Sequence, residues 1–267
     1  MFFKQTLTAV RSVFRIFDMA INKNGTGYTF LFSIIMVVIV GTALAYTSLS
    51  LKPLQKKNAA DKKMVDILGA IGVTTTRENA KTDFPISVKK RLSIDSEGNV
   101  LNSSSGNVDP ADSSDPFNLD VKKDYRSKKP ASELSFPLYV CESELGDTVY
   151  VIPVVGSGLW GPIWGFVALE SDMNTIYGAK FDHKTETPGL GAEIKDNEFS
   201  DKFKGQKLRE ASPYFTIIKG GRKIEDMHSV DGITGGTITS VGVGEMIDRT
   251  ISIYQRYFMS LTNSSAN

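Results

Sequence analysis

Residues 231–240, Asp-Gly-Ile-Thr-Gly-Gly-Thr-Ile-Thr-Ser, combine glycines and hydroxyl side chains directly before a helical pattern. The first backbone N–H groups of a helix have no partner within it, and the helix dipole is positive at that end. Such a run can therefore bind an anion such as a phosphate. It is not a P-loop, because no lysine follows its glycines, nor a dinucleotide fingerprint, because no suitable strand and acidic partner frame it. A plain turn that caps the helix is an equally open interpretation.

Residues 183–191, His-Lys-Thr-Glu-Thr-Pro-Gly-Leu-Gly, are the second candidate. Pro188-Gly189 predicts a tight turn with a positive φ at the glycine. His183 and Glu186 have the spacing of two metal ligands on a helix, but the proline and the glycines disfavour a helix here. His183 could act as a general base, yet no nucleophile motif such as Gly-x-Ser-x-Gly is present. A tight surface turn without chemistry is the plain alternative.

The composition excludes several other chemistries. The 267 residues include one cysteine (Cys141) and two histidines (His183 and His228), with a net charge of +1. One cysteine forms no internal disulfide. With two histidines it builds neither a four-ligand Cys/His zinc site nor a four-thiolate iron–sulfur cluster. The balanced charge argues against sequence-independent nucleic-acid binding. We therefore expect no metal site and no nucleic-acid partner.

An uncharged, mostly apolar segment, residues 25–51, precedes these motifs. As a helix, its 27 residues would be about 40 Å long, whereas the hydrocarbon core of a bilayer is about 30 Å thick. Tyr28 and Tyr46 lie near its ends, as interfacial aromatic residues do. The segment is predicted to span the bilayer once. A cleaved signal peptide, with a small-x-small site at residues 43–45, and a buried core helix are the alternatives.

The flanks of this segment leave its orientation open. Residues 1–24 alternate apolar and basic side chains, which is typical of an amphipathic helix on the cytoplasmic membrane surface; a plain polar segment is the alternative. The positive-inside rule does not decide, because similar numbers of basic residues lie on both sides. Four precede the span and five follow it: Lys4, Arg11, Arg15 and Lys23, then Lys52, Lys56, Lys57, Lys62 and Lys63.

Residues 52–267 are numerous enough for one domain with a sizeable core. Runs rich in Val, Ile, Tyr and Phe and bounded by Gly, Pro or Asp predict strands. Helical patterns occupy both ends of this part, so we predict an α+β fold with a mostly antiparallel sheet and flanking helices. The predicted strands are residues 138–142, 148–155, 165–169, 176–181 and 215–219.

Two helices and a loop complete the predicted elements. Residues 54–68 have a helical pattern that ends at two glycines, and residues 102–116 predict a solvated loop rich in Ser, Asp and Asn. Residues 243–261 carry apolar side chains at three- and four-residue spacing, and Thr239 or Ser240 is the predicted N-cap of this last helix.

Gly242 and Gly244 in the first turn of that helix indicate close approach of another segment, because glycine otherwise costs helix stability. The predicted divisions of the chain are residues 1–24, 25–51, 52–130 with the Ser-rich loop, and 131–267 as the domain that holds the two motifs.

Four segments, taken in order, resemble a known family. They are residues 158–160 (Gly-Leu-Trp), 165–170 (Gly-Phe-Val-Ala-Leu-Glu), 186–191 (Glu-Thr-Pro-Gly-Leu-Gly) and 234–239 (Thr-Gly-Gly-Thr-Ile-Thr). The chain is similar here to the NqrC family, the FMN-carrying subunits of the bacterial sodium-translocating NADH:quinone oxidoreductase, which have a covalent FMN-binding domain. The likeness extends to the apolar span and to residues 61–72, and so covers most of the chain except the Ser-rich loop.

The resemblance implies FMN joined through its phosphate to a threonine in the pattern Ser/Asp-Gly-Ala-Thr-x-Ser/Thr, which makes Thr237 the acceptor here. Thr234 stands at the Ser/Asp position and Gly236 at the Ala position, and both are small. Trp160 is a candidate wall of the pocket or a core residue, and His228 is a candidate flavin contact or the cap of a turn. The other implied cofactor-binding residues are Gly235, Ile238 and Thr239 beside the acceptor, and Glu186, Thr187, Pro188, Gly189, Leu190 and Gly191 in the turn, where the N–H groups of Gly189 and Gly191 would face the flavin ring.

The resemblance also implies a role. The chain would be an electron carrier of a membrane complex that oxidises NADH, reduces ubiquinone or menaquinone and exports sodium. FMN would supply the redox chemistry, so no acid–base catalyst is required. The implied partners are the other subunits, the flavin transferase that attaches FMN, and the lipid bilayer. The domain would lie on the periplasmic side of the inner membrane.

Two other functions stay open from the sequence. One is the homologous FMN-carrying subunit of the ferredoxin:NAD oxidoreductase (Rnf) complex, which shares the covalent-FMN pattern. The other is a membrane-anchored protein whose Gly/Thr run holds a phosphorylated ligand reversibly.

Overall fold

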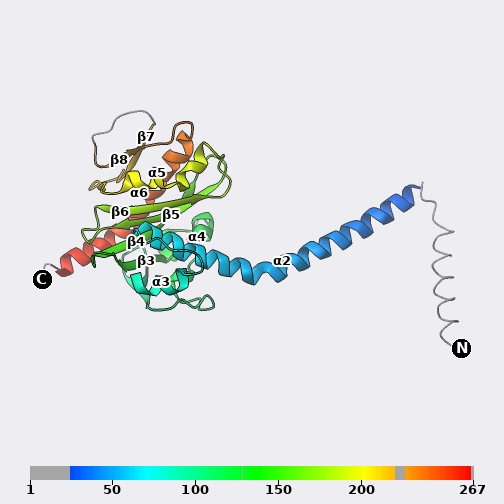
Figure 1. Cartoon of the computed structure of the whole chain (residues 1–267), viewed down its shortest axis with the longest axis horizontal. Helices are drawn as coiled ribbons and strands as arrows, with labels where there is room; N and C mark the ends of the chain where they lie inside the picture. Colours follow the sequence, from blue (N-terminus) through cyan, green and yellow to red (C-terminus); the bar gives the residue numbers. More distant parts are fainter. Residues whose placement is uncertain (1–24, 128, 220–225, 266–267) are drawn as a thin grey trace. The chain divides into compact units, whose positions relative to one another are not determined.

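The computed structural model describes residues 25–127, 129–219 and 226–265 (Figure 1). The amphipathic helix predicted within residues 1–24 lies outside the described residues. The chain divides into two compact units, Met1–Lys56 and Lys57–Asn267. The second unit contains the sheet and both motifs.

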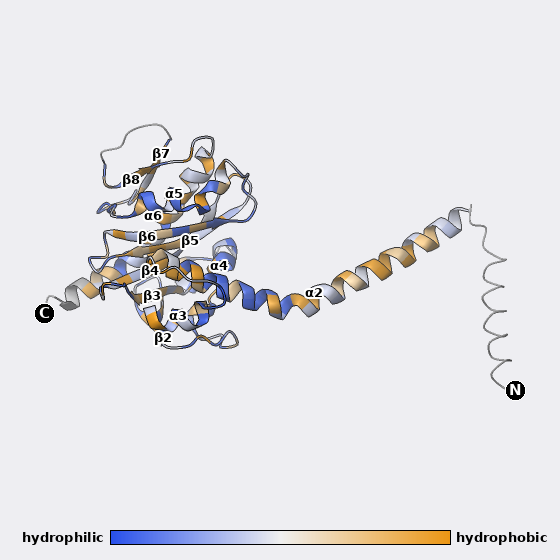
Figure 2. Cartoon of the chain, in the orientation of Figure 1, coloured by the Kyte–Doolittle hydropathy of each residue, from blue (hydrophilic) through white to orange (hydrophobic). Residues whose placement is uncertain are grey.

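The predicted span lies in one long helix, α2 (Thr26–Ala70). Figure 2 shows its N-terminal part as a mostly apolar run followed by a polar part. Among the described residues, α2 is the one helix long and apolar enough to cross a membrane, which agrees with a single anchor. The separate helix predicted from residue 54 is instead a continuation of α2 through Pro53. Proline removes one N–H from the helix, but its fixed φ is compatible with helix geometry.

Six strands form one antiparallel sheet in the order β2–β1–β3–β4–β5–β6. The sheet and its helices confirm the predicted α+β fold. The segment before residue 131 contributes two strands that the sequence did not predict, β1 and β2. The bounds are β1 (Val88–Ile94), β2 (Val100–Ser104), β3 (Phe136–Glu142), β4 (Thr148–Ser157), β5 (Pro162–Leu169) and β6 (Ile176–His183).

Helices cover both faces of this sheet. The last helix, α6 (Thr237–Ser265), packs through Val243 and its neighbours against Ile152 of β4. The C-terminal part of α2 and the short helix α3 (Ala80–Ser87) pack on the other face, where they meet Val151 of β4. Successive β4 residues therefore enter different cores, as the alternation of side chains along a strand requires. Because helices cover both faces of the sheet, a site is expected at the loops that follow the strand ends.

Cys141 of β3 belongs to the core beneath α2. Burial raises the pKa of its thiol. A thiol held in its protonated form within a core is chemically inert, since the thiolate is the reactive species.

Shorter elements connect the sheet to α6. Strands β7 and β8 pair in parallel, and β7 confirms the strand predicted at residues 215–219. Strand β8 leads into the glycine-rich run before α6. The elements between β6 and α6 are η3 (Gly191–Lys195), α5 (Asn197–Ser200), η4 (Asp201–Phe203), β7 (Thr216–Ile218) and β8 (Ser229–Asp231), where η denotes a 3₁₀ helix. Three further short elements lie between β2 and β3: η1 (Pro116–Asn118), α4 (Val121–Ser127) and η2 (Ala131–Glu133).

The helix α6 begins at Thr237, so the prediction that Thr239 or Ser240 caps it is wrong. Gly236 precedes the helix, and its carbonyl oxygen accepts the N–H of Ser240 at 2.9 Å. Ser240 lies inside the first turn, and its hydroxyl also donates to the Gly236 carbonyl at 2.9 Å. Hydroxyl residues within a first turn give the same local pattern as a cap.

The predicted close approach to the glycines of α6 is confirmed. A Cβ atom on Gly242 would lie 2.4 Å from the carbonyl oxygen of Ser157, and one on Gly244 would lie 3.1 Å from Cγ1 of Ile217. These glycines let the end of β4 and strand β7 pack directly on the helix backbone.

The solvated loop predicted at residues 102–116 is confirmed in part: residues 105–114 are exposed except for Val108, but the two ends of the stretch are structured. It begins in β2, and Asp115 near its end is buried. Arg91 of β1, only 1% exposed, donates from Nε and Nη2 to the two carboxylate oxygens of Asp115 at 2.9 and 2.7 Å. Its Nη1 donates to the carbonyl of Gly106 at 2.8 Å. Bidentate pairing is what makes burial of these charges tolerable.

Lys63 of α2 occupies a second buried polar position. Its Nζ donates to the carbonyl of Phe117 at 2.5 Å and lies 4.7 Å from the centre of that ring. Burial lowers the pKa of Lys63 to about 8, although the charges of Asp120 and Asp115 act to raise it. Burial likewise lowers the pKa of Lys122 to about 8.

A pH dependence of stability follows from these two lysines. In the unfolded chain the pKa of lysine is about 10.4. At these two lysines the unfolded chain therefore binds more protons than the folded chain between pH 8 and 10, so both make the free energy of unfolding rise with pH. The raised pKa of Cys141 acts in the opposite direction, so the contribution of Lys63 is measured by comparing a variant with the unmodified chain. Lys63→Met should raise the free energy of unfolding at pH 7 by about 1–3 kcal/mol and reduce its rise towards pH 10. Urea unfolding at pH 7–10 measures both, with the exposed Lys123→Met as control. An undiminished rise in Lys63→Met would contradict this account.

Candidate functional site

Glu186 joins three segments that are distant in the sequence. Its side chain is 5% exposed. Oε1 accepts the backbone N–H of Trp160 at 2.8 Å, and Oε2 accepts the hydroxyl of Thr239 at 2.5 Å. The hydroxyl of Thr185, which sequence reasoning missed, donates to the Trp160 carbonyl at 2.9 Å. The β4–β5 loop, the turn after β6 and the start of α6 therefore meet at one carboxyl group.

The turn after β6 has the predicted form. Gly189 adopts a φ of +76°, which glycine takes readily. Its N–H donates to Oε1 of Glu193 at 2.8 Å. The prediction that this N–H faces the flavin ring is therefore wrong. The N–H of Gly191, by contrast, makes no hydrogen bond within the part of the chain that the structure describes.

Leu190 brings this turn against the glycines that precede α6. A Cβ atom on Gly235 would lie 2.7 Å from Cδ2 of Leu190, and one on Gly236 would lie 3.1 Å from the Leu190 carbonyl oxygen. Gly235 also has a positive φ of +77°. The glycine at 236, where the family pattern has alanine, thus allows the turn to approach closely. The two sequence motifs form one site.

The start of α6 presents unpaired N–H groups. Those of Thr237, Ile238 and Thr239 make no hydrogen bond among the residues that the structure describes. Such groups at a helix N-terminus favour an anion.

The threonine hydroxyls beside these groups differ in availability. Thr239 is 2% exposed, and its hydroxyl is bonded to Glu186. Thr237 is half-buried and Thr234 is exposed. Within the described residues, the Thr237 hydroxyl makes no hydrogen bond. The first residue of α6 therefore offers an available hydroxyl beside unpaired N–H groups.

Exposed apolar side chains lie on the same three segments. Trp160 is 66% exposed, so it is not a core residue, and the alternative that it lines a pocket is retained. Large exposed apolar groups next to polar ones are typical of a binding surface. The group consists of Leu159 (52% exposed), Trp160, Leu190 (42%) and Ile238 (59%).

His228 has the contacts of a turn residue. Its backbone N–H donates to Oδ1 of Asp226 at 3.0 Å, and its ring Nδ1 lies 2.8 Å from the carbonyl oxygen of Lys207. Among the described residues, none of its hydrogen bonds reaches the three segments joined by Glu186. The contacts favour the cap of a turn over the flavin contact.

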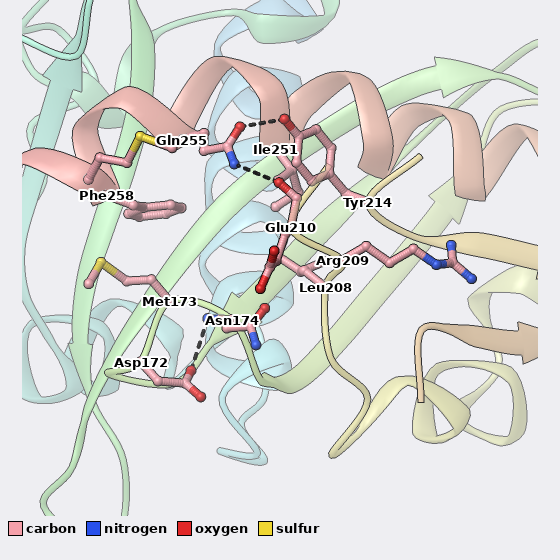
Figure 3. Close-up of a pocket in the computed structure, with 11 residues that line it drawn as sticks. Asp172, Met173, Asn174, Leu208, Arg209, Glu210, Tyr214, Ile251, Gln255 and Phe258 are labelled. Atoms are coloured by element: carbon pink, nitrogen blue, oxygen red, sulfur yellow. Dashed lines mark hydrogen bonds between the residues drawn. The ribbon is translucent and has the colours of Figure 1, made fainter. Parts of the chain in front are cut away.

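A cavity of about 180 Å³ lies along the C-terminal half of α6 (Figure 3). Gln255 bridges its wall by hydrogen bonds with the Tyr214 hydroxyl and the Glu210 carbonyl. Ile251, which also lines it, is about 20 Å from Thr237 along the helix. Ligand pockets usually measure about 300–1,000 Å³. The cavity is too small and too remote to belong to the site at Thr237.

Residues 158–252 match the family of FMN-binding domains. This range contains all three segments that Glu186 joins. The fold, the site and this match define a class: an FMN-binding-domain protein with an apolar N-terminal helix.

Similar proteins narrow the class. The chain is 31% identical to the NqrC subunit of the Na⁺-translocating NADH-quinone reductase of Vibrio anguillarum over 226 residues, which cover 81% of this chain and 85% of the relative. It is 28% identical to the Pseudomonas aeruginosa counterpart over 247 residues, covering 85% and 91%. The crystal structure of the same subunit from Parabacteroides distasonis matches with a TM-score of 0.66 and 34% identity, covering 78% of this chain and 96% of that one. The crystal structure of Shewanella oneidensis NqrC matches with a TM-score of 0.57 and 27% identity, covering 76% of this chain and 98% of that one.

The chain therefore belongs to the NqrC family of Na⁺-translocating NADH-quinone reductase subunits. This is the family that the four sequence segments resemble.

Proposed function

We propose that this chain carries FMN as a phosphodiester on Thr237 and acts as an electron carrier in a membrane complex that oxidises NADH, reduces a quinone and exports sodium. Bound FMN supplies the one-electron chemistry, while the protein supplies binding, orientation and electrostatics. The observation that carries the proposal is the arrangement at the start of α6, where the available hydroxyl of Thr237 lies beside three unpaired N–H groups.

The residues present fit a phosphodiester at this position. A phosphodiester keeps one negative charge, which the N–H groups of Thr237, Ile238 and Thr239 and the helix dipole would stabilise. Thr239 is a poor acceptor, because its hydroxyl is buried and donates to Glu186. Gly235 and Gly236 accommodate Leu190, which brings the turn after β6 close to this position.

The flavin ring would be held by the turn after β6. Leu190 offers an exposed apolar surface that already contacts the glycines before α6. The N–H of Gly191 is available to a ring oxygen or nitrogen, and the exposed Trp160 would form a wall. Thr187 and Pro188 shape the turn. We leave His228 out of the proposed site.

The proposed partners follow from the family. The other subunits of the sodium-translocating complex would donate and accept the electrons. A flavin transferase would attach FMN from an activated donor. In that step the Thr237 oxygen bonds to phosphorus and loses its proton, while the other phosphorus substituent of the donor leaves.

Mass spectrometry tests the attachment. The full chain, expressed with its flavin transferase and digested, should yield the Thr237 peptide heavier by FMN less one water. Fragmentation should place the addition on Thr237. A peptide without the addition, or with the addition on Thr234 or Thr239, would overturn the assignment.

We also propose that the unit after α2 lies on the periplasmic side of the inner membrane, as the resemblance implies. Alkaline phosphatase is active only outside the cytoplasm, so a fusion at the C-terminus should be active in cells. An inactive fusion that is present in the membrane would overturn this orientation.

A further inference from the structure

The Glu186 carboxyl group lies at the centre of the site, between the three segments, but it is buried. It is 5% exposed, and both of its oxygens are occupied, one by the Trp160 N–H and one by the Thr239 hydroxyl. Both of these hydrogen bonds of the carboxylate thus join segments of the protein. The turn motif therefore contains one residue whose role differs from that of its neighbours.

Two glycines enclose this carboxyl group. A Cβ atom on Gly158 would lie 2.7 Å from Oε1, and one on Gly191 would lie 2.6 Å from Oε2 and 2.5 Å from the Thr239 hydroxyl oxygen. The pocket around Glu186 thus has no room for a larger side chain at either position. In the arrangement that these glycines allow, Glu186 contacts all three segments.

We propose that Glu186 is a positioning residue that sets the distance between the Leu190 turn and Thr237, by tying Thr239 and the Trp160 loop to the turn. The proposal rests on the proposed attachment of FMN to Thr237. Thr239 is two residues after Thr237 in the same helical turn, so fixing Thr239 fixes the start of α6. Leu190 and Gly191 then lie against that start through the contacts with Gly235 and Thr239.

Weakening the hydrogen bond between Glu186 and Thr239 should affect the binding of the flavin ring more than the stability of the fold. Glu186→Gln retains an oxygen that can accept the Trp160 N–H, but it replaces the charged acceptor of the Thr239 hydroxyl by an amide N–H₂. The charge-assisted hydrogen bond from Thr239 is lost, and only a weaker neutral one, donated by the amide to the hydroxyl, can take its place. Thr239→Val removes the same hydrogen bond from the other side with little change of shape. Loss of a hydrogen bond to a charged group should shift the balance between the tied and the loosened arrangement by about tenfold or more.

The test uses the full chain expressed with its flavin transferase. We expect Glu186→Gln and Thr239→Val each to lower the FMN content of the Thr237 peptide several-fold and to weaken the visible circular dichroism of the flavin that remains. The flavin midpoint potential should shift in the same direction in both. The double variant should add little to either single variant, since both remove one contact. Thr239→Ser, which keeps the hydroxyl, should match the unmodified chain in FMN content and in the circular dichroism of the flavin.

Glu193→Gln is the matched control. Glu193 also accepts a backbone N–H of this turn, that of Gly189, but makes no contact with Thr239 among the described residues. It should load FMN as the unmodified chain does. If the unmodified chain is loaded and both Glu186→Gln and Thr239→Val match it in FMN content, circular dichroism and potential, the positioning role is wrong. An unmodified chain without FMN on Thr237 would instead overturn the proposed attachment, and this proposal with it.

Discussion

A chain with Thr237→Ala, expressed together with its flavin transferase, is expected to contain no covalent FMN. The hydroxyl of Thr237 is the oxygen of the proposed phosphodiester, and alanine has none to offer. Thr239 does not replace it, because Thr239 is buried and bonded to Glu186. FMN content should fall from near one per chain to none detectable, measured by mass spectrometry of the peptide and by flavin fluorescence of the denatured protein.

The loss should occur without loss of the fold. The Thr237 hydroxyl makes no hydrogen bond among the described residues, so the free energy of unfolding should change by no more than about 0.5 kcal/mol. Thr237→Ser, which keeps a hydroxyl, should retain part of the FMN. Ser252→Ala serves as control, since this exposed residue of α6 bonds only within the helix, to the Arg249 carbonyl. Covalent flavin on Thr237→Ala would contradict the assignment.

Arg91→Ala should destabilise the domain by about 3–5 kcal/mol, because it leaves the buried carboxylate of Asp115 without its charged partner. Asp115 also accepts the N–H of Phe117 at 2.9 Å, so its displacement would disturb the core beneath α2 as well. Urea unfolding of the full chain in detergent, followed by circular dichroism, measures the effect.

Two comparisons isolate the buried pair. The double variant Arg91→Met/Asp115→Leu should be less destabilised than Arg91→Ala, since it leaves no unpaired charge in the core. The exposed ion pair of Arg256 with Glu97 provides the opposite case. Glu97→Gln should change the free energy of unfolding by less than about 1 kcal/mol. Equal losses in Arg91→Ala and Glu97→Gln would show that burial of the first pair does not matter.

The sequence predicts the strands whose residues are apolar throughout. β4 and β5 are buried on both faces, so their Val, Ile and Phe runs stand out, and the predicted segments fall within the observed strands. β1 was not predicted, because Lys89, Lys90 and Arg91 interrupt its apolar pattern. The last of these charges is buried and paired with Asp115, 24 residues away, which no local pattern can reveal.

The two site motifs are evident from the sequence, but their contacts are not. Pro-Gly and Gly-Gly runs indicate turns through their backbone requirements. The contact of Glu186 with Thr239 joins residues 53 apart in sequence and depends on how β6 and α6 pack on the sheet. The wrong N-cap has the same cause. Thr239 has the side chain of a cap, but Glu186 engages its hydroxyl, and the helix begins two residues earlier.

The sealed position of Cys141 makes the chain a convenient background for labelling. It is the single cysteine of the sequence, and its side chain lies in the core beneath α2. A cysteine introduced at an exposed residue outside the site, such as Leu145 (85% exposed) between β3 and β4, would then be the sole thiol of this chain open to a maleimide or a spin label. Distances from such a probe to the flavin could be measured in the assembled complex without first removing the native cysteine.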